Sequence, residues 1–250
     1  MHETSTTPAA RILVVEHEAP AGPGMLGEAL RAEGAELVTV GPDTGREIPA
    51  SLDGYDALIV LGGTPGPTDD DIAPWLPATR ELVAQALADE VPHLGVCLGA
   101  QILAVVAGGR VSDAALPEVG LCDIALTPAA EGDPLLDGLT ASDGGPLRAM
   151  QWHLLEVTEL PPGSRSLANN ERCANQAFRV GANAWGLQFH LEANAAIAQS
   201  WIDDPGAGAQ LASFGVSTES IIEPMTAAEA ELRETWATVA QRWLALARRP

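Results

Sequence analysis

Residues 93–101 read His-Leu-Gly-Val-Cys-Leu-Gly-Ala-Gln, and this stretch indicates how the chain folds. Its first four residues form a short apolar run typical of a buried parallel strand, and a helical pattern starts near Leu98. Cys97 therefore lies on a sharp turn between strand and helix, with Gly95 and Gly99 two positions to either side. Because a Cβ atom at either glycine would clash with the reversed backbone, the spacing predicts a nucleophile elbow.

The position of Cys97 at a helix start has a chemical consequence. Unpaired N–H groups and the helix dipole favour a thiolate over a thiol there. The alternative is a buried structural thiol, since free cysteine is among the most buried residue types. Cys122 and Cys173 lack glycine neighbours of this kind and are interpreted as structural. The three cysteines are odd in number and form no C-x-x-C pair, so we expect no disulfide framework and no zinc knuckle.

The pattern of strand followed by helix extends outward from the elbow towards the N-terminus. Short apolar runs predict strands at residues 12–16, 37–40 and 55–61, and helical patterns fall at residues 26–34 and 75–90. Alternating strands and helices predict a parallel sheet covered by helices on both faces.

The second half of the chain has a different pattern. Short strand candidates separated by turn residues occur at 124–126, 147–150, 166–168, 177–180 and 185–189, and helices are expected at 194–203 and 218–247. The expected fold class is therefore α/β: a flavodoxin-like, open, mostly parallel sheet flanked by helices, with a mixed or antiparallel extension in the second half. No linker divides the chain, so we expect a flexible N-terminus at residues 1–10 and a single domain at residues 11–250.

Composition excludes several classes of function. The 250 residues include 34 acidic and 13 basic side chains, for a net charge of −21, and every basic residue is Arg. Without Lys the chain cannot form a standard P-loop or a pyridoxal-phosphate Schiff base, and no cofactor is expected. The acidic balance argues against binding of nucleic acid. No apolar run reaches the roughly 18 residues of a membrane span, and no secretory signal is visible, so we expect a cytoplasmic protein without a membrane partner.

A second chemical element, Gln188-Phe189-His190-Leu191-Glu192, follows the last predicted strand. An imidazole can take the proton of a cysteine nucleophile, and a carboxylate can hold that imidazole in one tautomer. Taken alone, the two residues are more typical of a surface His beside a surface Glu. Because strand ends in open parallel sheets are where sites form, we expect His190 and Glu192 to lie near Cys97. His17 and His93 have no second ligand at a useful spacing, so no metal site is expected.

Three stretches of the chain resemble motifs of the class I (triad) glutamine amidotransferases. They are Leu61-Gly62-Gly63, the elbow at residues 95–101, and residues 186–192, and the similarity covers residues 12–193. The resemblance implies that Cys97 is the nucleophile, His190 the base and Glu192 the residue that orients it. It also implies an oxyanion hole formed by Gly63 and Leu98. The residues that it implies for binding of substrate are Gly62, Gln101, His153 and Gln176.

Two departures from the family pattern are visible: Leu191 stands where the family usually has Pro, and Gly63 is followed by Thr64 rather than Pro. Neither change removes a reactive group. The implied activity is hydrolysis of the glutamine side-chain amide through a cysteine thioester, with ammonia passed to an unknown acceptor, commonly on a synthetase subunit. Two alternatives stay open: a cysteine hydrolase or transpeptidase that acts on a γ-glutamyl bond, and a regulatory subunit without catalytic activity.

Overall fold

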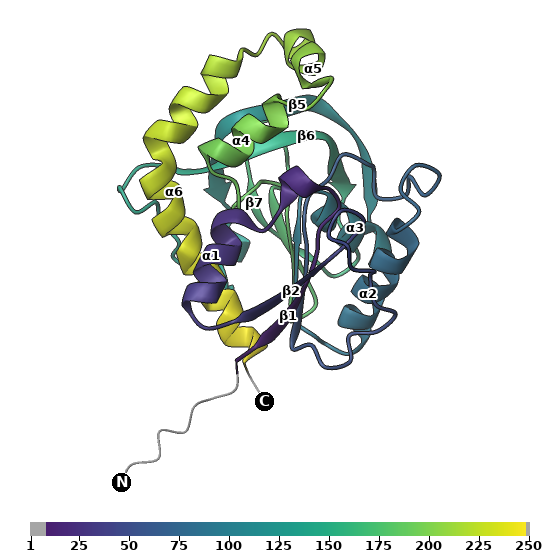
Figure 1. Cartoon of the computed structure of the whole chain (residues 1–250). Coiled ribbons are helices and arrows are strands. Elements are labelled where there is room, and N and C mark those ends of the chain that lie inside the picture. Colours follow the sequence, from purple (N-terminus) through teal and green to yellow (C-terminus); the bar gives the residue numbers. More distant parts are fainter. Residues whose placement is uncertain (1–8, 249–250) are drawn as a thin grey trace.

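The computed structural model describes residues 9–248. Residues 1–8, most of the segment expected to be flexible, lie outside the described part, and Ala10 is buried. Strands and helices alternate through the first half except that β3 follows β2 directly (Figure 1). The order is β1 (Arg11–Val15), η1 (Ala19–Ala21), α1 (Gly24–Ala32), β2 (Glu36–Val40), β3 (Ala57–Val60), α2 (Leu76–Ala88), β4 (His93–Val96) and α3 (Leu98–Val106).

The second half adds strands first and helices last. Its elements are β5 (Arg110–Leu126), η2 (Pro128–Ala130), β6 (Leu147–Glu159), β7 (Arg165–Asn169), β8 (Ala177–Val180), β9 (Ala184–Leu187), α4 (Ala195–Ile202), α5 (Ala207–Phe214) and α6 (Thr218–Ala247). None of the helices in the described part of the chain is long and apolar enough to cross a membrane.

The nine strands within residues 9–248 join in one sheet, in the order β2-β1-β3-β4-β9-β8-β7-β5-β6. The pairings from β2 to β9 are parallel, and those from β9 through β8, β7 and β5 to β6 are antiparallel. The last strand in sequence, β9, therefore inserts beside β4. This arrangement confirms the predicted α/β fold with an antiparallel extension, and it brings the end of β9 next to Cys97.

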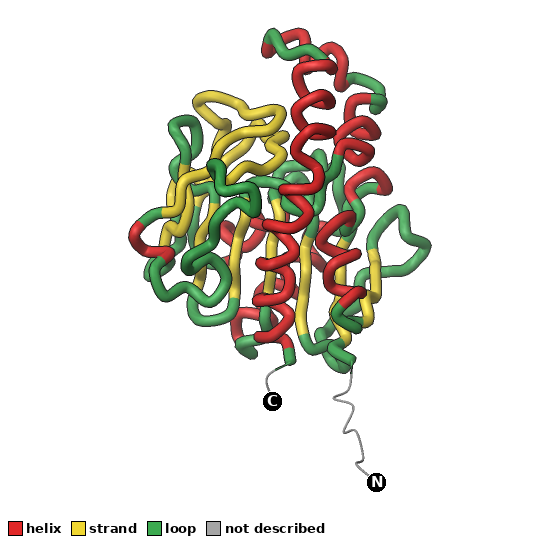
Figure 2. Tube along the Cα trace, turned by 90° about the vertical axis from the view of Figure 1, so that its left-hand side faces the viewer, coloured by secondary structure: helices red, strands yellow, loops and turns green. Residues whose placement is uncertain are grey.

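Helices cover both faces of the sheet. In Figure 1, α1 and α6 lie on one side of the strands and α2 and α3 on the other, and Figure 2 shows the long α6 running across the sheet towards the C-terminus. Residues 12–15 of β1 are all apolar because both faces of this strand are buried. Ile12 and Val14 pack into the core on the α1 and α6 side, whereas Leu13 and Val15 pack into the core on the α2 side.

The structure differs from the sequence prediction in two places. β5 and β6 are far longer than the predicted 124–126 and 147–150, and they pair as a long antiparallel ribbon with a bulge between Asp113 and Glu118. Much of β5 is only partly buried, so it lacks the apolar alternation that indicates a strand. The short helix α5 was not predicted, because it is bounded by Gly206 and Gly215 and buries only Leu211.

Candidate active site

The elbow between β4 and α3 has the strained backbone that the glycine spacing predicts. Cys97 has φ 49° and ψ −104°, a conformation that L-residues rarely adopt. A Cβ atom on Gly95 would lie 2.4 Å from the carbonyl oxygen of Gly99, and one on Gly99 would lie 2.0 Å from the carbonyl oxygen of Val60. Both flanking positions therefore require glycine. The side chain of Cys97, 6% exposed, projects at the carboxyl edge of the parallel strands.

His190 and Glu192 reach Cys97 because β9 lies beside β4. The N–H of Cys97 donates to the carbonyl of Leu187 at 2.7 Å, which ties the elbow to the end of β9. Three residues further on, the N–H of His190 donates to Met150 on β6 at 2.9 Å. The Nδ1 atom of His190 lies 2.6 Å from a carboxylate oxygen of Glu192. The imidazole and Cys97 are neighbours in the cavity wall, since a Cβ atom on Gly62 would lie 2.8 Å from Cε1 of His190 and 3.6 Å from Cβ of Cys97. Because Nδ1 faces Glu192, Nε2 is the ring atom left to face the sulfur.

Burial and the neighbouring groups have opposite effects on the pKa of His190. Burial favours the neutral ring, but the Glu192 carboxylate and the Cys97 sulfur favour the charged one, and the net effect raises the pKa of His190 to about 10. The other carboxylate oxygen of Glu192 is buried without a hydrogen-bond partner, so the charge of Glu192 is directed at the imidazole. The arrangement therefore favours an imidazolium on His190 at neutral pH.

A cavity of about 430 Å³ opens beside Cys97 and His190, within the size range of small-molecule sites. Gly63, Gln101 and His153 lie in its wall. Among the described residues that line it there is no Arg, whereas two carboxylates, Glu18 and Asp204, are present. Burial raises the pKa of Glu18, a hydrogen bond from Thr64 opposes that rise, and repulsion from Asp204 adds to it.

Three other residues implied by the family resemblance, Gly62, Leu98 and Gln176, each have different neighbours in the structure. A Cβ atom on Gly62 would lie 2.8 Å from Cε1 of His190, so the absence of a side chain there makes room for the imidazole. Leu98 is the first residue of α3, and its N–H has no partner within the helix. Gln176 does not line the cavity. It is fully buried, and its amide accepts from Gln151 at 2.9 Å and donates to Glu118 at 2.6 Å.

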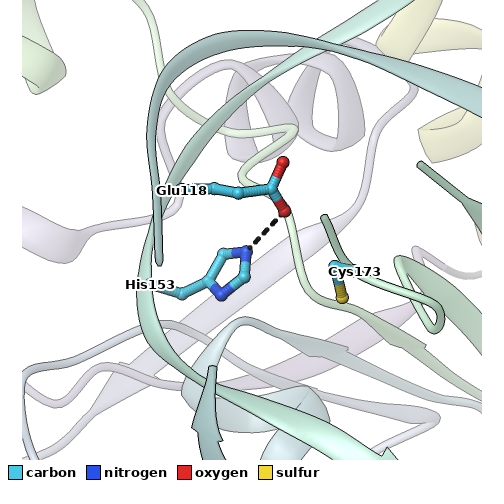
Figure 3. A group of neighbouring side chains, drawn as sticks. All are labelled: Glu118, His153 and Cys173. Atoms are coloured by element: carbon cyan, nitrogen blue, oxygen red, sulfur yellow. Dashed lines mark hydrogen bonds and ion pairs between the residues drawn. The ribbon is translucent and has the colours of Figure 1, made fainter. Parts of the chain in front are cut away.

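A second group of Cys, His and Glu side chains includes His153 of the cavity wall and two residues that do not line the cavity, Glu118 and Cys173 (Figure 3). Glu118, His153 and Cys173 place one potential ligand atom each within 4.8 Å of one another. Both ring nitrogens of His153 are already used, with Nε2 3.2 Å from Glu118 and Nδ1 3.1 Å from the carbonyl of Leu155. Burial raises the pKa of the Cys173 thiol, which keeps it neutral. No imidazole nitrogen is left to activate Cys173, so this group lacks the geometry of a nucleophile and its base.

Glu118 is instead the centre of a buried polar network. One of its oxygens accepts from Asn170 at 2.6 Å, and the other accepts from Gln176 and faces His153. These donors already occupy the carboxylate, and such a network fixes the wall of the cavity rather than leaving groups free for a ligand.

Comparison with known proteins agrees with this geometry. The model of the family "Glutamine amidotransferase class-I" matches residues 24–202. The chain belongs to the class-I glutamine amidotransferases. Both the elbow and the segment that carries His190 and Glu192 fall inside the matched region.

Curated relatives of this amidotransferase include single subunits and larger enzymes. A glutamine-hydrolysing GMP synthase subunit from Sulfurisphaera tokodaii is 35% identical over 65% of this chain and 79% of the relative. Aminodeoxychorismate synthase of Streptomyces griseus is 35% identical over 65% of this chain, but only 21% of that protein is covered. A glutamine amidotransferase-like protein of Salmonella typhimurium is 31% identical over 59% of this chain, and the match spans 61% of the relative's length.

Solved structures cover more of the amidotransferase chain. A glutamine amidotransferase of Thermotoga maritima superposes with a TM-score of 0.80 at 25% identity, over 95% of this chain and 99% of that one. One from Methylobacillus flagellatus also gives 0.80, at 26% identity and 96% coverage of both chains.

Sequence reasoning missed some side chains of the site. Glu18 and Asp204 come from loops far apart in the chain, and no local pattern indicates that they share a cavity. Gln188 could have been found: it precedes His190 by two positions, and its amide lies 3.6 Å from Sγ of Cys97. Residues two apart in extended backbone point to the same side, so a signal was present in the quoted motif.

Proposed function

We propose that this amidotransferase hydrolyses the side-chain amide of glutamine through a thioester on Cys97 and releases ammonia for an acceptor on another protein. The observation that carries the proposal is that Cys97 and His190 lie in the wall of one cavity, with Nδ1 of His190 2.6 Å from a carboxylate oxygen of Glu192. A nucleophile, its base and the group that orients the base form the arrangement that covalent acyl transfer needs.

The chemistry proceeds in two halves. The thiolate of Cys97 attacks the carboxamide carbon, and the carbonyl electrons move to the oxygen. When the tetrahedral intermediate collapses, the C–N bond breaks and the Nε2 proton of His190 passes to the leaving nitrogen, which departs as ammonia. Water then attacks the thioester while His190 takes one of its protons. The C–S bond breaks, and glutamate leaves with Cys97 returned to the thiolate.

Backbone and wall groups support these steps. The N–H groups of Gly63 and Leu98 are proposed to hold the oxyanion, since a Cβ on Gly63 would lie 3.2 Å from Cδ2 of Leu98 and the two residues are neighbours. Gln101, in the cavity wall, is proposed to position the substrate, and His153, whose ring nitrogens are both used, to shape that wall. Gly62 contributes space for His190 rather than a contact with substrate.

The acceptor is proposed to belong to a synthetase partner. The support for this comes from the curated relatives that are named as a GMP synthase subunit and as aminodeoxychorismate synthase. Leu154, at the cavity wall, is 37% exposed, and this apolar side chain offers a partner a contact beside the cavity. Because the chain carries a net charge of −21, a partner with a basic surface would associate faster at low salt.

A second candidate is hydrolysis of a γ-glutamyl amide whose amine carries a positive charge. The specific observation is that Glu18 and Asp204 line the cavity, and that no Arg does among the residues described there. The same Cys97 chemistry would cleave such a bond, since the carbonyl is the same and only the leaving amine is larger.

The test compares ammonia release from glutamine with cleavage of γ-glutamyl amines by the purified protein. Cys97→Ala should abolish both reactions and leave the fold intact. Cys173→Ala is the matched control, because its neutral thiol has no free imidazole, and it should retain activity. Loss of activity in Cys173→Ala with activity retained in Cys97→Ala would overturn the assignment. Faster turnover of a cationic γ-glutamyl amine than of glutamine would favour the second candidate.

A further inference from the structure

We propose that Gln188 is a further catalytic residue, whose side-chain amide donates a hydrogen bond to the sulfur of Cys97 and stabilises the thiolate. Gln188 follows β9 and is fully buried, and its Nε2 lies 3.6 Å from Sγ of Cys97. The proposal rests on the proposed role of Cys97 as nucleophile.

The direction of this hydrogen bond follows from a backbone carbonyl. The side chain of Gln101 lies 3.1 Å from the carbonyl oxygen of Leu155, which can only accept, so the atom that Gln101 presents there is its NH₂ group. The same NH₂ group lies 3.4 Å from the amide of Gln188, which must therefore present its oxygen to Gln101. With its oxygen turned to Gln101, Gln188 has only its NH₂ group left to face Cys97. An amide flip that would reverse the contact with sulfur is thus excluded by two further hydrogen bonds.

The carbonyl of Leu155 is itself held in place. It also accepts from Nδ1 of His153 at 3.1 Å, and the opposite nitrogen of His153 faces Glu118. This explains what the buried group of Figure 3 contributes: it fixes the acceptor that orients Gln101, which in turn orients Gln188.

The hydrogen bond from the Gln188 amide to Sγ of Cys97 matters because of the other groups that surround the sulfur. On the side of β6, Sγ of Cys97 faces the carbonyl oxygen of Trp152 at 3.9 Å, a contact that suits a thiol but repels a thiolate. His190 can supply a second donor to the sulfur, but in the proposed mechanism its Nε2 proton passes to the leaving nitrogen as the C–N bond breaks. Gln188 cannot ionise, so its N–H stays on the sulfur throughout the reaction. It keeps Cys97 a good leaving group when the thioester is hydrolysed.

The experiment measures the rate of alkylation of Cys97 by iodoacetamide as a function of pH, read by peptide mapping. In Gln188→Met the midpoint of the rate profile should rise by about one pH unit, because a hydrogen bond to a charged group has been removed. The matched control is Thr79→Val in α2, a fully buried side chain that donates to the carbonyl of Trp75 and makes no hydrogen bond to the residues that orient Gln188. Its midpoint should equal that of the parent protein.

An unchanged midpoint in Gln188→Met would overturn the proposal, and so would an equal shift in both variants. If Gln188→Met does not fold, side-chain ¹⁵N NMR of the parent protein keeps the test available. The Gln188 amide signal should move with the titration of Cys97 and stay fixed in Cys97→Ser, and a signal that ignores the titration would refute the contact. Alkylation needs no substrate, so this result is independent of whether glutamine is hydrolysed.

Discussion

Replacing Gly99 by Ala tests whether the elbow depends on close packing of backbone against backbone. The new Cβ would lie 2.0 Å from the carbonyl oxygen of Val60 and 2.7 Å from its carbonyl carbon, whereas carbon and oxygen atoms normally stay about 3.3 Å apart. Neither atom can swing away as a flexible side chain would, because Val60 belongs to the buried strand β3. Helix α3 must therefore retreat from the sheet by about 1 Å, at a cost of about 3 kcal/mol for overpacking of this kind.

For a domain of this size, each kcal/mol lowers the melting temperature by about 2–4 °C, so Gly99→Ala should melt about 6–12 °C below the parent. The matched control is Gly208→Ala in α5, where nothing lies within 4 Å of the new Cβ and alanine is the better helix former. Calorimetry measures both variants. A displacement of Cys97 by about 1 Å should also lower glutamine turnover about 100-fold. Equal melting temperatures for the two alanine variants would show that the elbow tolerates a side chain and that the steric reasoning is wrong.

Three further predictions concern charge. Because the pKa of His190 is raised to about 10 in the folded protein, the protonated ring stabilises the fold below pH 6.5, and this stability is lost as the pH rises to about 10. The urea midpoint should therefore fall over this window in the parent protein and fall less in Glu192→Gln. Parallel profiles of the two proteins would contradict the ion pair. Asp133→Ala should lower the free energy of unfolding by about 3 kcal/mol or more, measured in urea, because it removes a buried carboxylate that lies 3.1 Å from Arg179. Binding of a synthetase partner should weaken with added salt, measured as the association rate, and a rate that does not depend on salt would argue against a basic docking surface.

The first half of the fold could be predicted because three of its strands, β1, β3 and β4, are buried on both faces. Residues 93–96 form a strand as expected, and the helix begins at Leu98, since both elements are defined by local apolar runs and glycine spacing. The ribbon of β5 and β6 could not be predicted at its full length. Strands with one exposed face and a bulge take their stability from pairing with each other, and that pairing is not visible in either segment alone.

The same distinction applies to the candidate site. The positions of Cys97, His190 and Glu192 could be inferred because each follows a buried strand, and the ends of parallel strands meet at one edge of the sheet. Gln176 was expected to contact substrate, but it packs behind the wall, where Glu118 engages its amide. That outcome depends on the path of β5, which no local pattern indicates. The two acidic residues of the cavity depend in the same way on how distant loops pack.

The positive φ of Cys97 destabilises the fold at the same residue that is proposed to act as the nucleophile. Backbone strain of this kind costs about 1–3 kcal/mol, and glycine would remove most of it. The sequence therefore has a mutational path along which Cys97→Gly yields a more thermostable protein without a nucleophile. A screen that selects only for soluble expression or heat resistance would enrich that change. Directed evolution of this scaffold needs selection for turnover in every round.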